Sequence, residues 1–402
     1  MFLTVLVLSV NTILIFIIWN SITGYSQLIR QFLFAFAWCA IEYVRSFGSL
    51  GFPWISIANT QTDYLMIIQN AELIGIYGIS FWIIVINIFI YNTLNNKNIK
   101  WASITLTTFI VPLFSGYILY SNVGIGEKEL SVSVAQPNVH LSEKRKDNMD
   151  RKALSNLLDL SSSSIDQEVD LIVWPETSIS NDSYNIKRIV NRLKNSGSQI
   201  VSGINNSYYN SISLMNQDGV VGVYNKLQLV PMAESVPLSN FLGFLDRFNI
   251  GTGSFLSGTD FTIFSANQNN FGSMVCFEST FPHLSKRFVK EGASFLVYVV
   301  NDGWYETAPE PQQHAKQSIF RAIETRRPVV RSANTGISMI VDQFGNIQES
   351  LELNQRGIIE NVKIFPSEKI TFYVRYGDYL VYIMMIILLY AFIRSKIDEK
   401  KI

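Results

Sequence analysis

Cysteine, histidine and charged residues are all scarce in this 402-residue sequence, and each scarcity removes a class of protein. Of the two cysteines, Cys39 lies in a run predicted to cross the membrane and Cys276 in a domain predicted to lie outside the bilayer, so a disulfide between them is not expected. The three histidines (His140, His283 and His314) show no ligand spacing, so we expect no metal and no cofactor. Basic and acidic residues balance at 32 each without a long basic run, which argues against a nucleic-acid partner.

Charged residues make up only 16% of the chain and hydrophobic residues 48%, and the apolar excess is concentrated in a few nearly uncharged runs. These runs approach the roughly 20 residues that span a bilayer. They are residues 2–19, 31–41, 73–91, 101–120 and 379–393. We therefore predict about five transmembrane helices, four before residue 121 and one near the C-terminus.

The first apolar run, residues 2–19, has a cleaved signal peptide as its alternative interpretation. No basic segment precedes it, it is longer than a typical signal core, and it shows no cleavage site of small residues. These features favour a retained membrane helix.

Basic residues beside the predicted spans set the orientation, because cytoplasmic loops are enriched in lysine and arginine. The basic residues concerned are Arg30, Lys97, Lys100, Arg394, Lys396, Lys400 and Lys401. Alternating spans then place the intervening domain outside the cytoplasm. We predict three parts: residues 1–120 with about four transmembrane helices, an extracytoplasmic domain at 121–375, and a C-terminal transmembrane helix with a cytoplasmic tail at 376–402.

The segment from residue 130 onward alternates between strand-like and helix-like patterns, which indicates an α/β layered domain. The expected strands are residues 130–135, 171–174, 199–203, 211–215, 220–224, 272–275, 295–300 and 336–341. The expected helices are residues 152–160, 186–195 and 312–325.

Three apolar stretches in this domain each carry one reactive side chain: LIVWPE with Glu176, YNKLQLVP with Lys226, and FGSMVCFE with Cys276. A carboxylate, an amine and a thiol supply a base, an electrostatic stabiliser and a nucleophile. A buried inert thiol and a surface lysine are the alternatives. The end-of-strand position of Cys276 and the apolar flanks of Lys226 favour catalytic roles.

These motifs, together with the run NDGWYETAPEPQQHAKQSIFRAIETRRPVVRSANTGISMIVDQFG at residues 301–345, resemble the apolipoprotein N-acyltransferase family. That family is the membrane-fused branch of the carbon-nitrogen hydrolase (nitrilase) superfamily. The resemblance implies an αββα sandwich inserted between transmembrane helices, and a triad of Glu176 as base, Lys226 as stabiliser and Cys276 as nucleophile. It also implies more membrane helices than are predicted here, so the chain looks shortened at its N-terminus.

Further residues take supporting roles by the same resemblance. Glu234, Glu278 and Phe277 would support the triad, with structural ion pairing as the alternative for the two glutamates. Pro53, Trp54 and Trp304 would line a pocket or the path by which lipid arrives. The alternative for Pro53 and Trp54 is an interfacial anchor.

A group of basic residues around His314 is dense enough to hold a phosphate. Its members are Arg321, Arg326, Arg327 and Arg331. We favour the alternative that they form scaffold salt bridges on a helix and the strand that follows it.

The resemblance implies a two-step reaction in the bacterial inner membrane, with the catalytic domain on the periplasmic side. A phospholipid would donate its acyl chain to Cys276, and the thioester would pass it to the N-terminal amine of diacylglyceryl-cysteine on an apolipoprotein. The alternative is a membrane-tethered carbon-nitrogen hydrolase, an amidase. An inactive scaffold is disfavoured because all three triad residue types are present.

Overall fold

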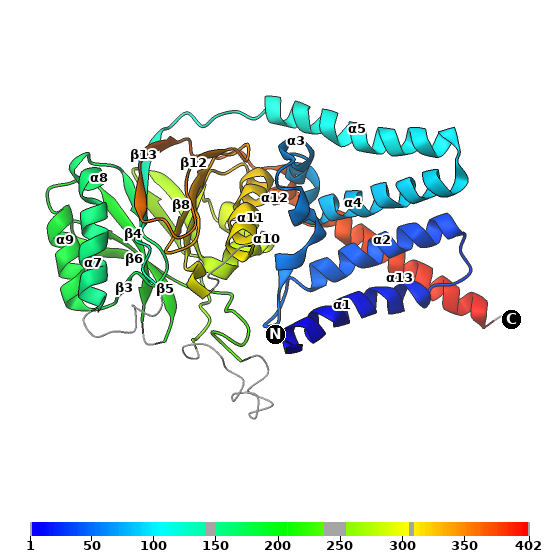
Figure 1. The fold of residues 1–402 in the computed structure, drawn as a ribbon, viewed down its shortest axis with the longest axis horizontal. Helices are drawn as coiled ribbons and strands as arrows, with labels where there is room; N and C mark the ends of the chain where they lie inside the picture. Colours follow the sequence, from blue (N-terminus) through cyan, green and yellow to red (C-terminus); the bar gives the residue numbers. More distant parts are fainter. Residues whose placement is uncertain (1, 141–148, 207, 237–254, 305–308, 401–402) are drawn as a thin grey trace. The chain divides into compact units, whose positions relative to one another are not determined.

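The computed structural model describes residues 2–140, 149–206, 208–236, 255–304 and 309–400. The chain divides into two compact units. A helical unit combines Met1–Asn122 with Arg375–Ile402, and a second unit comprises Val123–Val374 (Figure 1). The second unit holds the three sequence-predicted catalytic residues and is called the catalytic unit for that reason.

The helical unit consists of long apolar helices and a few short turns (Figure 1). Its elements are α1 (Phe2–Asn20), α2 (Gln27–Val44), η1 (Pro53–Ile55), η2 (Ile57–Gln61), α3 (Leu65–Ile68), α4 (Ala71–Asn96), α5 (Ile99–Ser121) and α13 (Tyr379–Glu399). Among the described residues, α4, α5 and α13 are long and apolar enough to cross a membrane. In α1 (Phe2–Asn20), the part whose side chains are described, Ser9–Asn20, is also an apolar helix but is shorter than that length. The sequence-based count of about five spans therefore stays a prediction.

Apolar side chains hold the helical unit together, and α13 lies against the N-terminal helices although it is more than 250 residues away in the sequence. Met384 packs with Ala35 and Ile84, while Leu388 and Ala391 join a second cluster with α1 and α2. The unit is therefore completed by the last helix of the chain.

One end of the helical unit gathers most of its described basic residues. The backbone N–H of Thr23 donates to Ser395 Oγ over 2.9 Å, and Asn92 Nδ2 donates to Gln31 Oε1 over 2.9 Å. These contacts bring together the α1–α2 connection, the C-terminal turns of α4 and α13, and the start of α5. The basic residues at or next to this end are Arg30, Lys97, Lys100, Arg394 and Lys396.

Two β-sheets form the centre of the catalytic unit (Figure 1). The first has the order β13 (Gly357–Ile364), β1 (Leu130–Gln136), β2 (Leu171–Val173), β4 (Gln199–Asn205), β5 (Asn210–Asn216), β6 (Gly219–Asn225), with β3 (Ile179–Ser180) paired to β4. The second has the order β12 (Ile347–Leu351), β11 (Ser338–Val341), β10 (Val329–Ala333), β9 (Phe295–Val300), β8 (Asn269–Val275), β7 (Ile263–Ala266). Parallel pairing joins β1, β2 and β4 in one sheet and β8, β9 and β10 in the other.

Helices cover the outer face of each sheet. The first sheet is covered by α7 (Met149–Leu160), α8 (Ser162–Asp166) and α9 (Ser183–Leu193), and the second by α10 (Pro282–Lys290) and α11 (Glu310–Thr325). Short elements complete the unit: η4 (Cys276–Thr280), η5 (Asp302–Trp304) and α12 (Phe372–Tyr376). Because β1 and β5 also contact β10 and β8 of the other sheet, the unit is a four-layer αββα sandwich. The predicted α/β class is confirmed.

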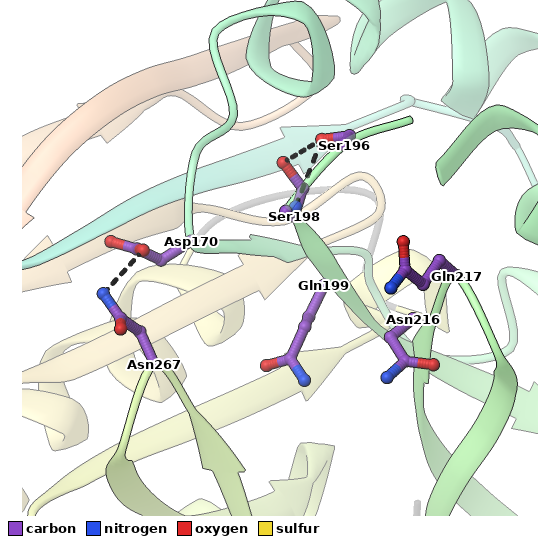
Figure 2. Close-up of a pocket in the computed structure, with 8 residues that line it drawn as sticks. Asp170, Ser196, Ser198, Gln199, Asn216, Gln217 and Asn267 are labelled. Atoms are coloured by element: carbon purple, nitrogen blue, oxygen red, sulfur yellow. Dashed lines mark hydrogen bonds between the residues drawn. The ribbon is translucent and has the colours of Figure 1, made fainter. Parts of the chain in front are cut away.

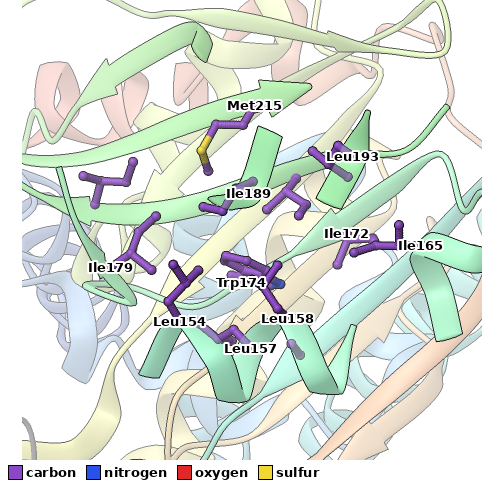
Figure 3. Packing of buried hydrophobic residues seen from close by; sticks show 13 residues of the cluster. Leu154, Leu157, Leu158, Ile165, Ile172, Trp174, Ile179, Ile189, Leu193 and Met215 are labelled. Atoms are coloured by element: carbon purple, nitrogen blue, oxygen red, sulfur yellow. The ribbon is translucent and has the colours of Figure 1, made fainter. Parts of the chain in front are cut away.

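The central strands are buried on both faces, which is why they are continuous apolar runs in the sequence. Under the helices of the first sheet, Trp174 packs with Leu154 and Leu157 of α7 and Ile189 of α9 (Figure 3). Its indole Nε1 donates to Ser161 Oγ over 2.9 Å, so the single polar atom of this large side chain is satisfied in the core. The residue two positions before Glu176 is thereby fixed.

Candidate active site

The turn that carries Glu176 continues β2 along the edge of β4. The Trp174 N–H donates to the Val201 carbonyl over 2.8 Å, and the Gly203 N–H donates to the Pro175 carbonyl over 3.1 Å. A Cβ on Gly203 would lie 2.5 Å from the Glu176 Cα, so only glycine allows this approach. Glu176 is held by backbone on both sides and is 6% exposed.

Lys226 follows β6 directly and is 1% exposed. Its Nζ lies 2.9 Å from Glu234 Oε1, 2.8 Å from Glu234 Oε2, and 3.9 Å from Glu176 Oε1. Asn210 links the two carboxylates, because its Nδ2 donates to Glu176 Oε1 over 2.7 Å and to Glu234 Oε1 over 2.9 Å. One buried ammonium is thus shared between two carboxylates.

Lys226 and the two carboxylates, Glu234 and Glu176, stabilise one another's charged forms in the protein interior. Burial by itself would lower the pKa of Lys226, but Glu234 and then Glu176 raise that pKa above its usual range. Burial likewise works against the charge of Glu234, yet the Lys226 ammonium lowers the pKa of that carboxyl. Lys226 therefore stays positively charged at neutral pH.

Cys276 stands at the end of β8, where the chain turns into η4. Its backbone φ is +49°, a left-handed conformation that costs energy in a residue with a side chain and is characteristic of functional turns. Burial and then the charge of Glu176 raise the pKa of the Cys276 thiol well above its usual value. Lys226 and the Asn301 backbone N–H act in the opposite direction. The resting sulfur is a thiol, and it needs a base to become a nucleophile.

Glu278 connects the Lys226 segment to the Cys276 turn. Its Oε1 accepts from the Tyr224 hydroxyl (2.8 Å) and from the backbone N–H groups of Leu227 (2.7 Å) and Gln228 (3.0 Å). Its Oε2 accepts from the Val275 N–H over 2.8 Å. A single fully buried carboxylate therefore fixes Lys226 and Cys276 relative to each other.

A second group of polar side chains lies behind Cys276. Ligand atoms of Cys276, Asp302 and His314 lie within 4.8 Å of one another, a spacing that would suit a metal ion. However, the Asp302 oxygens already contact His314 Nδ1 at 2.7 Å and an Arg331 nitrogen at 2.9 Å. The Arg331 guanidinium already supplies a positive charge at this point and occupies one Asp302 oxygen. The three side chains therefore satisfy one another better than they would bind a metal cation.

The arginines that follow along the chain are buried parts of the scaffold. Arg321 pairs with Glu324 at 2.9 Å, while Arg326 and Arg327 donate to backbone carbonyls. All three are withdrawn from solvent, as is Arg331. The scaffold interpretation is therefore favoured over a phosphate site.

The remaining predicted residues are distributed over both units. Phe277 is buried and packs edge-to-face on Phe281, with ring centroids 5.0 Å apart, so it ties the start of η4 to the residue that caps its end. In the helical unit Pro53 is buried and Trp54 is partly exposed, both in η1. Trp304 ends η5, and its side chain lies outside the described residues.

Glu42 anchors the segment that contains Pro53 and Trp54. The Ile57 N–H donates to Glu42 Oε1 over 2.8 Å, and the Ser56 and Ser80 hydroxyls each donate to Oε2 over 2.6 Å. The η1–η2 segment is thereby tied to α2 and α4. A role for Pro53 and Trp54 in admitting lipid stays a prediction.

Sequence reasoning missed several polar residues of the site. Asn210, Tyr224 and Ser279 carry no local signal, because a single amide or hydroxyl on a strand or turn is common. Asn301 and Asp302 offered a weak signal, since both follow a strongly apolar strand. Their partners are distant in the sequence, so only the fold reveals the grouping.

A polar cavity of about 250 Å³ lies at the other end of the first sheet (Figure 2). It is lined by Asp170, Ser196, Gly197, Ser198, Gln199, Asn216, Gln217 and Asn267. The β5–β6 pairing sets Asn216 opposite Gly219 at this end and Ser211 opposite Asn225 at the end next to Lys226. None of the triad residues lines the cavity, so it is separate from the candidate active site.

Comparison with known proteins gives matches to both units. Residues 131–361 match the carbon-nitrogen hydrolase family, and residues 1–89 match the apolipoprotein N-acyltransferase N-terminal domain. An apolipoprotein N-acyltransferase of Geobacter metallireducens is 30% identical over 367 residues, covering 86% of this chain and 70% of that protein. One from Thermotoga maritima is 29% identical over 364 residues, covering 90% of this chain and 70% of that protein.

Among solved structures, this chain is similar to Saccharomyces cerevisiae Nit3, a member of branch 10 of the nitrilase superfamily. The TM-score is 0.47 and the identity 16%, over 61% of this chain and 93% of that one.

Proposed function

We propose that this chain, which belongs to the apolipoprotein N-acyltransferase family, transfers an acyl chain from a phospholipid to the amine of diacylglyceryl-cysteine on an apolipoprotein. The observation that carries the proposal is the group formed by the partly buried Cys276 and the buried Lys226 and Glu176, in a unit that is flanked in sequence by membrane-length helices. A thiol nucleophile forms a thioester, and attachment to a membrane supplies lipid donors and lipid-anchored acceptors at high local concentration.

In the first half-reaction, Glu176 takes the proton of the Cys276 thiol, and the thiolate attacks the ester carbonyl of the phospholipid. The tetrahedral oxyanion is stabilised by the Lys226 ammonium together with a backbone N–H near Phe277. The intermediate collapses with cleavage of the C–O ester bond, and the leaving alkoxide takes the proton from Glu176. Lysophospholipid departs, and the acyl chain remains as a thioester on Cys276.

In the second half-reaction, the α-amino group of the acceptor attacks the thioester carbonyl, and Glu176 takes the ammonium proton that forms. Lys226 again stabilises the oxyanion. The C–S bond breaks, an amide is released, and the sulfur recovers its proton from Glu176. Atoms and charges balance over the cycle, and no cofactor takes part.

Glu234, Glu278 and Phe277 serve this chemistry indirectly in the proposal. Glu234 keeps Lys226 charged and in place, with its oxygens 2.8 and 2.9 Å from Nζ. Glu278 ties the Lys226 segment to the Cys276 turn through backbone N–H groups of both. Phe277 packs on Phe281, which caps the end of η4.

The proposed topology has the basic end of the helical unit in the cytoplasm. Since α5 ends and α13 begins away from this end, both connections to residues 121–375 leave from the opposite side of the membrane. The full proposal has about five transmembrane helices, a bacterial inner membrane, and a periplasmic catalytic domain. Alkaline phosphatase fused after about residue 125 should be active, and a fusion after Lys97 inactive. The reverse pattern contradicts the orientation.

The function is tested with purified protein, phospholipid and a synthetic diacylglyceryl-cysteine peptide, with products followed by mass spectrometry. The expected products are N-acylated peptide and an equal amount of lysophospholipid, both absent with Cys276→Ala. Free fatty acid alone, or cleavage of a soluble amide without peptide acylation, would identify a hydrolase instead.

A further inference from the structure

Arg331, Asp302 and His314 form a series of three contacting, buried polar side chains that ends against the backbone of Cys276. Arg331 donates to Asp302 Oδ2 over 2.9 Å, and the other oxygen, Oδ1, lies 2.7 Å from His314 Nδ1. His314 Nε2 then lies 2.9 Å from Ser279 Oγ and 3.1 Å from the Cys276 carbonyl oxygen. Arg331 is fully buried, and His314 and Asp302 are each 1% exposed.

The fold brings these three side chains and the Cys276 turn together from four separate elements. Asp302 follows β9, Arg331 belongs to β10, His314 lies on α11, and the Cys276 turn follows β8. A Cβ at Gly336 would lie 2.3 Å from Asp302 Oδ2, so a glycine is required to make room for the carboxylate. Desolvating a cation, a carboxylate and an imidazole is costly unless they satisfy one another, as they do here.

The proton positions follow from the order of the groups. The Arg331 guanidinium always donates, so Asp302 is an ionised acceptor, and His314 gives it the Nδ1–H. Burial and then Arg331 lower the pKa of His314, which leaves its ring neutral and its Nε2 an acceptor. The Ser279 hydroxyl has one proton, which it gives either to His314 Nε2 (2.9 Å) or to the Cys276 carbonyl oxygen (2.7 Å), and the unprotonated Nε2 touches that oxygen at 3.1 Å without a hydrogen bond. The imidazole and the serine therefore enclose the carbonyl of the nucleophile.

We propose that His314, oriented by Asp302 and Arg331, is a positioning residue that holds the left-handed turn of Cys276 and thereby aims its sulfur at the acyl carbonyl. The proposal rests on the proposed function only in taking Cys276 as the nucleophile. The same carboxylate also fixes the end of β9, where the Asn301 backbone N–H faces the Cys276 sulfur. One ion pair thus controls both the carbonyl and the sulfur of a single residue.

The test compares substitutions of His314 that keep or lose a polar atom at the Nε2 position. Glutamine places its amide where Nε2 lies and can donate to the Cys276 carbonyl or accept from Ser279, whereas asparagine reaches only the Nδ1 position. His283→Gln and His140→Gln are the controls. His283 is partly buried and His140 is exposed, and neither belongs to the Arg331–Asp302–His314 series. The measured quantity is the rate of hydroxylamine-sensitive acylation of Cys276 by labelled phospholipid at saturating lipid.

We expect His314→Ala and His314→Asn to acylate about 100-fold more slowly than wild type, the loss that a displacement of about 1 Å produces, with the half-saturating lipid concentration unchanged. His314→Gln should recover about tenfold of that loss. The two control variants should stay within about twofold of wild type. Equal rates for His314→Ala and wild type, or equal rates for Gln, Asn and Ala at position 314 in folded protein, overturn the proposal.

A second variant covers the case in which His314→Ala does not fold. Ser279→Ala removes the hydroxyl that lies between the His314 ring and the Cys276 carbonyl. It leaves the charges of Arg331, Asp302 and His314 unchanged. We expect about tenfold slower acylation, with the melting temperature lowered by no more than the loss of one buried hydrogen bond explains. An unchanged acylation rate in Ser279→Ala overturns the proposal regardless of the His314 variants.

Failure of the proposed function gives a different pattern. If wild type forms the acyl-enzyme but releases only fatty acid, the transferase proposal fails while the order Gln above Asn and Ala still holds. If phospholipid does not acylate wild type at all, the same variants are compared by alkylation of Cys276 with iodoacetamide. The same order is expected there, and its absence overturns the inference.

Discussion

The two sides of Cys276 are built from similar parts but differ in the atom that they affect most. On one side, the Lys226 ammonium and the Glu176 carboxylate both shift the pKa of the sulfur. On the other, Arg331, Asp302 and His314 end at the backbone carbonyl, and Asp302 also raises the pKa of the sulfur, less than Glu176 does. We expect the first side to set mainly the charge of the sulfur and the second mainly its orientation. Substitutions on the two sides should therefore differ in their effects.

The largest effect is expected for Glu176→Gln, which removes the base and one negative charge. Turnover should fall about 1,000-fold, because a positioned base contributes roughly that much. Alkylation of Cys276 at neutral pH should instead become faster, because Glu176 raises the pKa of the thiol. Both rates are measured on the same preparation.

The control for this prediction is Glu349→Gln on β12, an exposed glutamate, which should change neither rate. Slower alkylation in Glu176→Gln would contradict the electrostatic account of the sulfur.

Lys226→Met should have the next largest effect and the opposite sign on alkylation. Turnover should fall about 100- to 1,000-fold through loss of oxyanion stabilisation. Alkylation should slow, since Lys226 lowers the pKa of Cys276. Lys290→Met, at an exposed position on α10, is the matched control. Unchanged alkylation in Lys226→Met would place the ammonium too far from the sulfur to matter.

The pH profile of alkylation sharpens the same distinction. A raised pKa means that the thiolate forms at higher pH, so the wild-type profile should lie to the alkaline side of a free cysteine. Glu176→Gln should move it to lower pH and Lys226→Met to higher pH. His314→Gln should leave its midpoint near that of wild type. A shift in His314→Gln as large as in Glu176→Gln would show that the two sides are not separable.

Two glycines allow each side to be displaced without changing a charge. Gly203→Ala would push against the Glu176 backbone, and Gly336→Ala against Asp302. Each should lower turnover about 100-fold. Gly197→Ala is the control, because a Cβ there meets no atom within 4 Å. Wild-type turnover in Gly203→Ala would show that the Glu176 turn adjusts freely.

The smallest effect is expected for Tyr224→Phe, which removes one of the donors to Glu278. The unfolding free energy should fall by about 1 kcal/mol and turnover by only a few-fold, because the backbone donors to that carboxylate remain. Thermal unfolding and steady-state kinetics measure the two quantities. A loss as large as that in Lys226→Met would give Tyr224 a direct role in the reaction.

The candidate reactive residues could be selected from the sequence because each carries a reactive group at a recognisable local pattern. Glu176 and Cys276 each follow a buried strand, and the apolar residues of these strands form runs that can be recognised in the sequence. Strand β12 was missed because its side chains are mostly exposed and its sequence is largely polar. The α/β class follows from the pattern, but the pairing order of the strands depends on long-range contacts.

The positioning groups were not predictable for a different reason. Arginine is usually found at the surface, so the sequence gives no sign that Arg331 is buried. Only the fold shows that it pairs in the core with Asp302, 29 residues earlier. His314 stands 38 residues from the carbonyl that it approaches. Helix and strand periodicity does not encode such distances.

The packing of α13 against α2 and α4 has a consequence for how the protein is made. About 250 residues separate α5 from α13, and they form the whole catalytic unit. The ribosome therefore completes the first helices long before their last partner exists. Ala35, Cys39 and Ile84 pack around Met384 in the finished unit. Until α13 has been synthesised, these side chains lack that packing partner. Assembly of the helical unit is thus coupled in time to synthesis of the catalytic unit, and a chain that stops early lacks its final helix.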